Sequence, residues 1–87
     1  MKIADEPELK FPLECHFRVI AENQDQMHFV IETVLIQLGI RAPVVKTNTS
    51  GGGKYVSFNI TTMVESREIM NRIDRELRLI RGVRMVL

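Results

Sequence analysis

The 87-residue sequence contains no tryptophan, one cysteine, and aromatic side chains at only 6 % of its positions. A single cysteine cannot form a disulfide within the chain, which excludes the disulfide-stapled scaffolds of small secreted proteins. No segment approaches the roughly 18 consecutive apolar residues of a transmembrane helix, and the first residues lack the apolar core of a signal peptide. We therefore expect a cytoplasmic protein with no membrane partner.

The chain also has little net charge, because 12 basic and 11 acidic residues leave +1 at pH 7. Proteins that bind nucleic acid or anionic membranes usually show a basic excess, so any such binding would need a local patch. A hydrophobic content of 45 % can build one core, and the length suits one domain. The polar, acidic beginning is interrupted by Pro7, so we expect a flexible arm over residues 1–10 and a single domain over residues 11–87.

Apolar and polar residues alternate from Cys15 to Glu22, which predicts a half-buried strand. Its expected core side chains are Cys15, Phe17, Val19 and Ala21. Apolar residues then recur at spacings of three and four up to Gly39, which predicts a helix that ends at this glycine. The expected core residues of this helix are Met27, Val30, Ile31, Val34, Leu35 and Leu38. Asn23 or Asp25 can cap its first turn.

Residues 40–48 are rich in β-branched types but include Pro43, which cannot donate a hydrogen bond to a neighbouring strand. We expect a strand at the edge of the sheet, in a register that the pattern does not fix. Residues 48–53 are typical of a turn. Alternation resumes after it, with Val56, Phe58 and Ile60 on one side. The opposite side carries Tyr55, Ser57, Asn59 and Thr61. The pattern predicts a hairpin with a mobile tip.

Ser66 precedes a second helical pattern, which ends at Gly82. Its apolar stripe consists of Ile69, Met70, Ile73, Leu77 and Ile80. A last apolar run over residues 83–87 predicts a strand beside the first one, since chain ends fray unless a sheet or helix holds them. Strict alternation would direct Val83, Met85 and Leu87 into the core. Arg84 and Val86 would then face away from it.

Two strand–helix–strand halves joined by a hairpin describe the split βαβ, or ferredoxin-like, α+β fold. The expected architecture is βαββαβ, an antiparallel four-stranded sheet with both helices on one face. In the usual strand order of this fold, the last strand lies beside the first at an edge. The other face of the sheet would then be open to partners.

Several segments carry a family resemblance: Phe11-Pro12, Arg18-Val19, the Ser/Gly-rich turn before Tyr55 and, above all, the terminal Val83-Arg84-Met85-Val86-Leu87. They resemble the YbeD-like bacterial proteins, a family named as domain of unknown function 493. The resemblance implies a fold similar to ACT regulatory domains, which bind small effectors such as amino acids, commonly at dimer interfaces. It brings no catalytic residues. The resemblance therefore implies a regulatory or binding domain that is not an enzyme.

Two places are candidate binding sites. The first is the turn over residues 21–25, which corresponds to the effector-binding turn of ACT domains but has no glycine. There, Asn23 and Asp25 are either ligand-binding residues or helix caps. The second is the open face of the sheet, with Arg18, Tyr55 and Arg84 as its binding residues. His16, Ile20, Ser57, Asn59 and Val86 are also expected on that face.

The open face could meet a protein partner or a small anionic metabolite. Nucleic-acid binding is the alternative, and it is disfavoured because Tyr55 is the one aromatic residue expected there. Exposed sheet edges also suggest a homodimer, through an edge or the open face, although Pro43 discourages pairing on one side.

Other chemistries find little support in the sequence. The Gly-rich run from Ser50 to Lys54 lacks the spacing of a phosphate-binding loop and leads into a strand. Cys15, His16 and His28 do not form a metal-ligand set, and Cys15 is expected in the core. No nucleophile has a defined base, and no paired carboxylates lie in an apolar setting. The sequence therefore predicts no cofactor, no metal and no catalytic residue.

Overall fold

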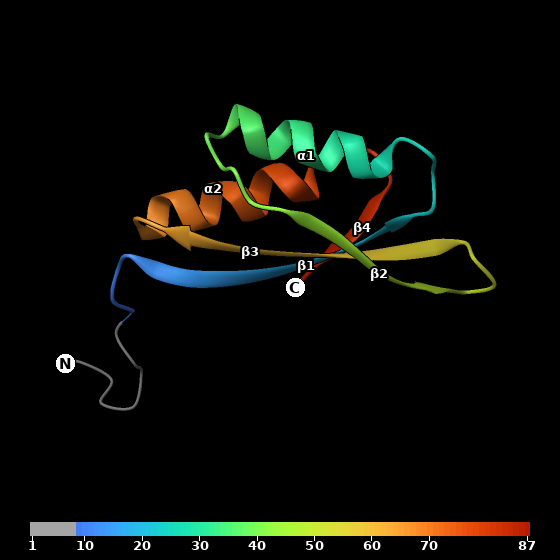
Figure 1. Cartoon of the computed structure of the whole chain (residues 1–87), viewed down its shortest axis with the longest axis horizontal. Coiled ribbons are helices and arrows are strands. Elements are labelled where there is room, and N and C mark those ends of the chain that lie inside the picture. Colours follow the sequence, from blue (N-terminus) through green and yellow to red (C-terminus); the bar gives the residue numbers. More distant parts are fainter. Residues whose placement is uncertain (1–8) are drawn as a thin grey trace.

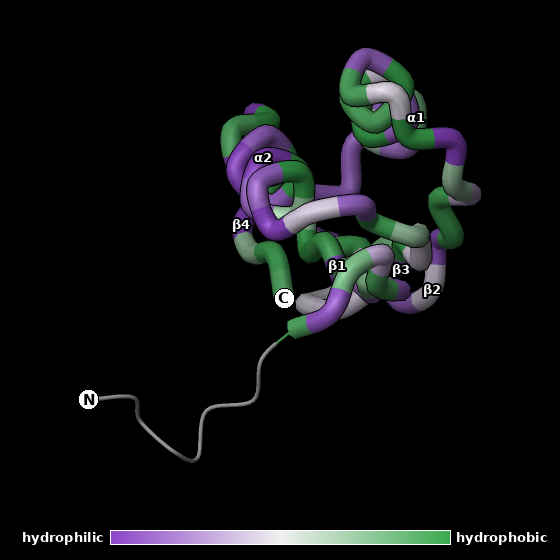
Figure 2. Tube along the Cα trace, turned by 90° about the vertical axis from the view of Figure 1, so that its left-hand side faces the viewer, coloured by the Kyte–Doolittle hydropathy of each residue, from purple (hydrophilic) through white to green (hydrophobic). Residues whose placement is uncertain are grey.

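The computed structural model describes residues 9–87 (Figure 1). Its elements are β1 (Leu13–Glu22), α1 (Met27–Gln37), β2 (Val44–Ser50), β3 (Tyr55–Val64), α2 (Arg67–Arg78) and β4 (Val83–Val86). The strands form one four-stranded sheet in the order β2-β3-β1-β4, and every neighbouring pair is antiparallel. Both helices cover the same face (Figures 1 and 2). The predicted ferredoxin-like fold is confirmed. Most of the arm predicted over residues 1–10 lies outside the described residues.

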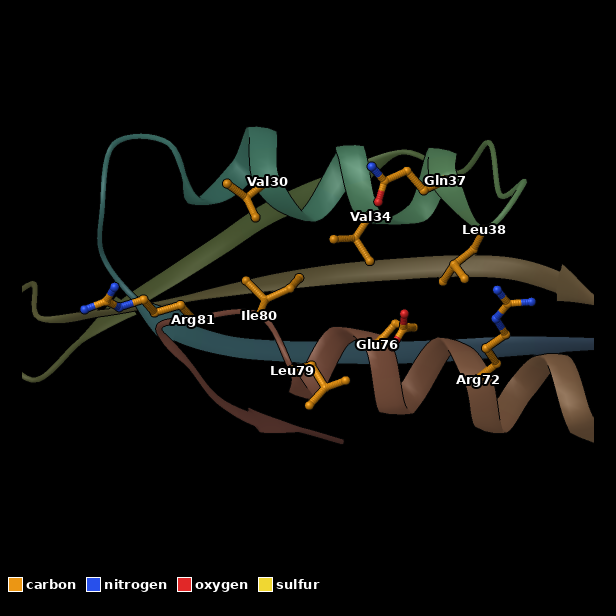
Figure 3. A pocket seen from close by; sticks show the side chains of 9 residues that line it. All are labelled: Val30, Val34, Gln37, Leu38, Arg72, Glu76, Leu79, Ile80 and Arg81. Atoms are coloured by element: carbon orange, nitrogen blue, oxygen red, sulfur yellow. The ribbon is translucent and has the colours of Figure 1, made fainter.

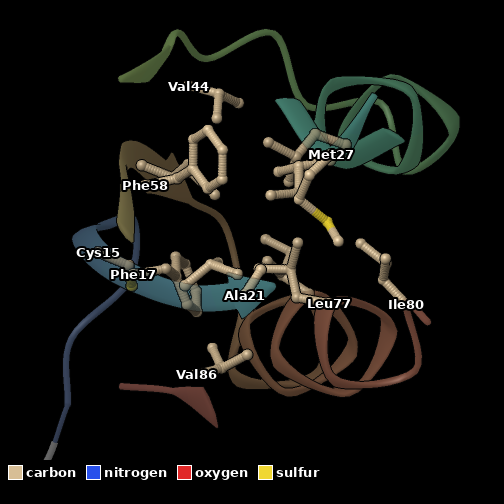
Figure 4. Packing of buried hydrophobic residues seen from close by; sticks show 14 of the residues in the cluster. Cys15, Phe17, Ala21, Met27, Val44, Phe58, Leu77, Ile80 and Val86 are labelled. Atoms are coloured by element: carbon tan, nitrogen blue, oxygen red, sulfur yellow. The ribbon is translucent and has the colours of Figure 1, made fainter. Parts of the chain in front are cut away.

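β1 is one of the two inner strands, and its alternation is regular. All ten of its residues pair with β3, from Leu13 opposite Val64 to Glu22 opposite Tyr55. The predicted core side of β1 is confirmed, because Cys15, Phe17, Val19 and Ala21 are all buried. They pack beneath buried residues of both helices, including Met27, Ile31, Leu35, Ile73 and Leu77 (Figure 4). One continuous core therefore lies between the sheet and the helical layer.

The start of α1 differs from the prediction. Neither Asn23 nor Asp25 caps the helix, since the residue at the cap position is Gln26 and it makes no side-chain cap hydrogen bond. Asn23 instead faces the hairpin, where its Nδ2 donates to the carbonyl oxygen of Gly53 at 2.9 Å. The cap interpretation was wrong because β1 delivers Asn23 next to the β2–β3 turn, whose carbonyls take its donors.

The strand predicted over residues 40–48 lies at the edge of the sheet, but it begins at Val44, after Pro43, and runs to Ser50. β2 pairs with β3 alone, with Val44 opposite Ile60 and Ser50 opposite Tyr55. The register shifts between Lys46 and Thr49, an irregularity that the sequence pattern does not reveal. Beyond this point the hairpin extends past the helical layer (Figure 1).

The second helix begins after Ser66 as predicted, but α2 ends at Arg78, four residues before Gly82. The Oγ atom of Ser66 accepts a hydrogen bond from the backbone N–H of Ile69 at 3.2 Å, so Ser66 caps the helix. Gly82 has a φ of +94°, a conformation that side-chain-bearing residues rarely adopt, and it turns the chain from α2 into β4. The sharp turn brings β4 back alongside β1.

The predicted orientation of β4 was wrong in its second half. Val86 is 2 % exposed and packs in the core, whereas Met85 is 46 % and Leu87 63 % exposed. The cause is a bulge: Ala21 pairs with Val83 but the preceding residue, Ile20, pairs with Met85. The extra residue, Arg84, breaks the alternation, so the side chains after it change faces. Val86 therefore leaves the predicted open face and enters the core.

Candidate functional site

The open face gathers only some of its predicted binding residues. Tyr55 lies opposite Glu22, and a guanidinium nitrogen of Arg84 lies 3.7 Å from a carboxylate oxygen of Glu22. Arg18 pairs with Asn59 farther along the strand, so it belongs to a separate part of the face. Glu22 thus joins Tyr55 and Arg84 into a small cluster at the end of β1 and already neutralises part of its positive charge.

Tyr55 is half-buried at the base of the hairpin. A Cβ atom placed on Gly51 would lie 3.1 Å from Cδ2 of the Tyr55 ring, so the ring packs against the bare backbone of this glycine. This contact covers part of the surface that a stacked base would need. The ring therefore serves the structure of the hairpin.

The two candidate residues of the β1–α1 turn, Asn23 and Asp25, also differ in their contacts. Asn23 bonds to Gly53 through its side chain, and its backbone N–H donates to the carbonyl oxygen of Lys54 at 2.8 Å. Asp25 is exposed, and no hydrogen bond or ion pair of its side chain is found among the described residues. Asn23 therefore holds the turn against the hairpin, whereas the carboxylate of Asp25 faces solvent.

A groove between the two helices encloses a hollow of about 490 Å³ with an apolar floor (Figure 3). Val30 and Val34 of α1 and Leu38, at the cap position after it, reach into the groove, and Ile80 lies opposite them after the end of α2. Its polar lining consists of Gln37, Arg72, Glu76 and Arg81. We call this hollow the interhelical groove.

The interhelical groove continues toward the turn between β1 and α1. A second hollow of about 450 Å³ shares Val30, Ile80 and Arg81 with it and adds the side chains of Gln24, Gln26 and Met27. Gly82 lets the α2–β4 turn come close here, since a Cβ on it would lie 2.8 Å from Cε of Met27. The β1–α1 turn has no glycine of its own. The bare backbone next to it is instead that of Gly82, in the α2–β4 turn.

The charges of the interhelical groove are not neutralised by ion pairs. Among the described residues, Arg72 and Arg81 have no carboxylate within 4.0 Å, and one acidic residue, Glu76, shares the lining. Arg72 and Arg81 lie at opposite ends of the groove (Figure 3), so a guanidinium at one end can hold an anionic group while the apolar floor takes a hydrocarbon portion. The arrangement suits a small amphipathic anion.

Sequence reasoning missed the interhelical groove because its lining comes from segments that are far apart in the chain. One signal was available, since α1 has more apolar positions than one stripe facing the core requires. Met27, Ile31 and Leu35 are fully buried, whereas Val30 and Val34 are only half-buried. These two positions mark the side of α1 that faces the groove.

The structure offers little for catalysis or metal binding. Within residues 9–87, no group of three or more His, Cys, Asp or Glu side chains could hold a metal ion. Cys15 is buried, and burial raises the pKa of its thiol, which lowers its reactivity. His28 donates from Nε2 to the carbonyl oxygen of Val44 at 2.7 Å and so joins α1 to β2. Among the described residues, no helix is long and apolar enough to cross a membrane.

Comparison with known proteins identifies the family of this chain. Residues 6–87 match the model of a family described as "Protein of unknown function (DUF493)". A UPF0250 protein of Shewanella frigidimarina is 32 % identical over 79 residues, which cover 91 % of this chain and 90 % of the relative.

Two solved structures share the fold. Protein HP0495 from Helicobacter pylori superposes with a TM-score of 0.82 at 23 % identity, over 97 % of this chain and 90 % of the other. The ACT domain of a GTP pyrophosphokinase from Chlorobium tepidum gives a TM-score of 0.71 at 17 % identity, over 85 % and 94 %. The fold is therefore ferredoxin-like and ACT-like, and the chain belongs to the DUF493 family of proteins of unknown function.

Proposed function

We propose that this protein is a non-enzymatic regulatory domain of the cytoplasm that binds a small anionic metabolite with an apolar portion in the interhelical groove. The observation that carries the proposal is an arginine at each end of the apolar floor, Arg81 and Arg72, neither of which has an ion pair within the described chain (Figure 3). Binding sites for small molecules typically combine such a floor with a few polar groups that fix orientation.

The position of Arg81 supports this proposal. It lines both the interhelical groove and the hollow beside the β1–α1 turn, where Gln24 and Gln26 add amide donors. An anionic group held there would lie next to the turn that ACT domains use for their effectors. The hydrocarbon portion would extend along Val30 and Val34.

The open face supports nucleic-acid binding less well. Arg84 is paired with Glu22, and Tyr55 packs against Gly51. Arg18 remains as an exposed cation on β1, but it has no aromatic neighbour across the strand pair, where Asn59 lies opposite it. We therefore keep one proposed function.

A titration of the isotope-labelled protein, followed by the chemical shifts of its backbone amides, tests the proposal. The panel contains amino acids, nucleotides, straight-chain carboxylates and a short RNA. Saturable shifts around Val30, Val34 and Ile80 with at least one small anion are expected. Shifts confined to Arg18, Tyr55 and Arg84 would instead indicate the open face, and they would refute the groove as the binding site.

A further inference from the structure

One edge of β1 is only partly covered. β3 pairs with the whole length of β1, but on the other side β4 reaches only the second half. The last contact is reciprocal: the N–H of Arg18 donates to the carbonyl oxygen of Leu87 at 3.1 Å, and the N–H of Leu87 donates to that of Arg18 at 2.8 Å. No described residue pairs with Leu13–Phe17 on this side.

The uncovered segment presents unpaired backbone groups. In a strand, successive residues direct their N–H and C=O groups to opposite edges, so Glu14 and His16 point to the same edge as Arg18. Within residues 9–87, neither has a backbone partner there. Such an edge is a template for another extended strand.

We propose that this edge pairs with the same edge of a second copy, as antiparallel strands related by a two-fold axis at Cys15. The segment Leu13–Phe17 is centred on Cys15, so the two copies fill each other's gap over its full length. Each His16 then forms a hydrogen-bonded pair with the partner's Glu14. The two sheets become one continuous sheet, in which β4 of each copy lies in line with β1 of the other.

Charge favours a second copy over an unrelated strand. Glu14 and His16 both lie on the exposed face of β1, and their side chains already approach to 3.5 Å within one chain. In the proposed pairing each glutamate faces the partner's imidazole, which can donate a hydrogen bond or carry positive charge. Opposite charges in directly facing positions stabilise a strand pair, and both pairs arise from one surface.

The face of this edge that the helices cover also suits a second copy. A hollow of about 310 Å³ beside the uncovered segment is lined by Cys15, Phe17, Met70 and Leu87, among others. In the proposed register, Leu13 of each copy lies opposite the partner's Phe17 and directs its apolar side chain toward this hollow. Partner strands that add to a sheet edge gain specificity from such pockets for alternate side chains.

The start of β1 leaves room for the partner. Residues 11 and 12 form a bend, and the chain turns away where β1 begins (Figure 1). Residues 9–12 therefore leave the line along which the partner's β4 would lie. The proposed strand pairing therefore stops at Leu13, next to the bend at residues 11 and 12.

The oligomeric state, measured by sedimentation velocity over a concentration series, tests this proposal. The wild-type chain is expected to form a dimer. His16→Pro removes an N–H that points to the free edge and not to β3, so the variant is expected to be monomeric while it keeps its fold, as checked by circular dichroism.

His16→Glu, which does not restrict the backbone, places like charges opposite each other and should weaken the dimer at least about fivefold. The double variant Glu14→Lys/His16→Glu restores opposite charges and should recover the dimer. Lys46→Glu on β2, the other edge strand, is the control and should change nothing. A monomeric wild type, or a dimer that responds to Lys46→Glu but to neither change at His16, would overturn the proposal.

Discussion

Arg78 donates a hydrogen bond from Nη2 to the carbonyl oxygen of Val86 at 2.7 Å. The same guanidinium donates from Nε to Asp74 at 2.8 Å, so the last turn of α2 holds its arginine in place over β4. Val86 in turn directs its side chain into the core. The end of the sheet is thus joined to α2 by a backbone acceptor on one side and by apolar packing on the other.

The orientation of β4 can be tested by alanine substitution. Val86→Ala should lower the free energy of unfolding by about 2 kcal/mol, because it leaves a cavity beneath α2. Met85→Ala, at an exposed position of the same strand, should change it by less than about 0.5 kcal/mol. Chemical denaturation measures both values. A larger loss for Met85→Ala than for Val86→Ala would show that the strand alternates without a bulge.

The role of Asn23 can be separated from that of Asp25. Asn23→Ala removes the hydrogen bond to Gly53 and should cost about 1 kcal/mol of unfolding free energy. Asp25→Ala should cost less than about 0.5 kcal/mol, because the carboxylate caps nothing. Equal and substantial losses at both positions would instead indicate that each contributes a cap to α1.

Gly82→Ala tests the close approach of the two turns. Alanine at a φ of +94° is strained by about 1 to 2 kcal/mol, and its Cβ would also meet Cε of Met27 at 2.8 Å. Gly52→Ala is the matched control, since its φ is +69° but no atom lies within 4 Å of the added Cβ. Thermal unfolding should show a larger loss for Gly82→Ala. An equal loss of stability in both variants would mean that the Met27 side chain moves away from the added Cβ without destabilising the fold.

The buried thiol of Cys15 makes the free energy of unfolding depend on pH in the alkaline range. Burial raises the pKa of its thiol above the ordinary value of 9.0, so the folded state favours the neutral form. This contribution is fully present below pH 9.0 and is lost as the pH rises, since the unfolded chain then releases the proton first. The stability advantage of the wild type over Cys15→Ala, measured by denaturation, should shrink above that pH. An advantage that grows there would contradict the burial of the thiol.

Regular alternation explains which parts of the fold were predictable. β1 pairs with β3 without interruption, so its period of two identified every buried residue from Cys15 to Ala21. β4 has a bulge at Arg84, and a bulge depends on pairing with β1 and not on the local pattern. The prediction therefore placed the strand correctly but reversed Val86.

The candidate site was less predictable for a related reason. The cap assigned to Asn23 is a local interaction, but a tertiary contact with Gly53 replaces it. The interhelical groove depends on how far apart two helices lie, which no spacing within either helix encodes. Arg72, Arg75 and Arg81 are alike in sequence, and only the fold separates the first and last from Arg75, which is not among the residues that line the groove.

The most direct test of the proposed function compares two arginines in the same ligand titration. For any small anion that shifts the amides of the interhelical groove, Arg81→Gln should weaken binding about tenfold, because a charge-assisted hydrogen bond is lost. Arg75→Gln removes the same charge from α2 outside the groove and should leave the affinity unchanged. Equal weakening by both variants, or no saturable groove shifts with any member of the panel, would contradict the account.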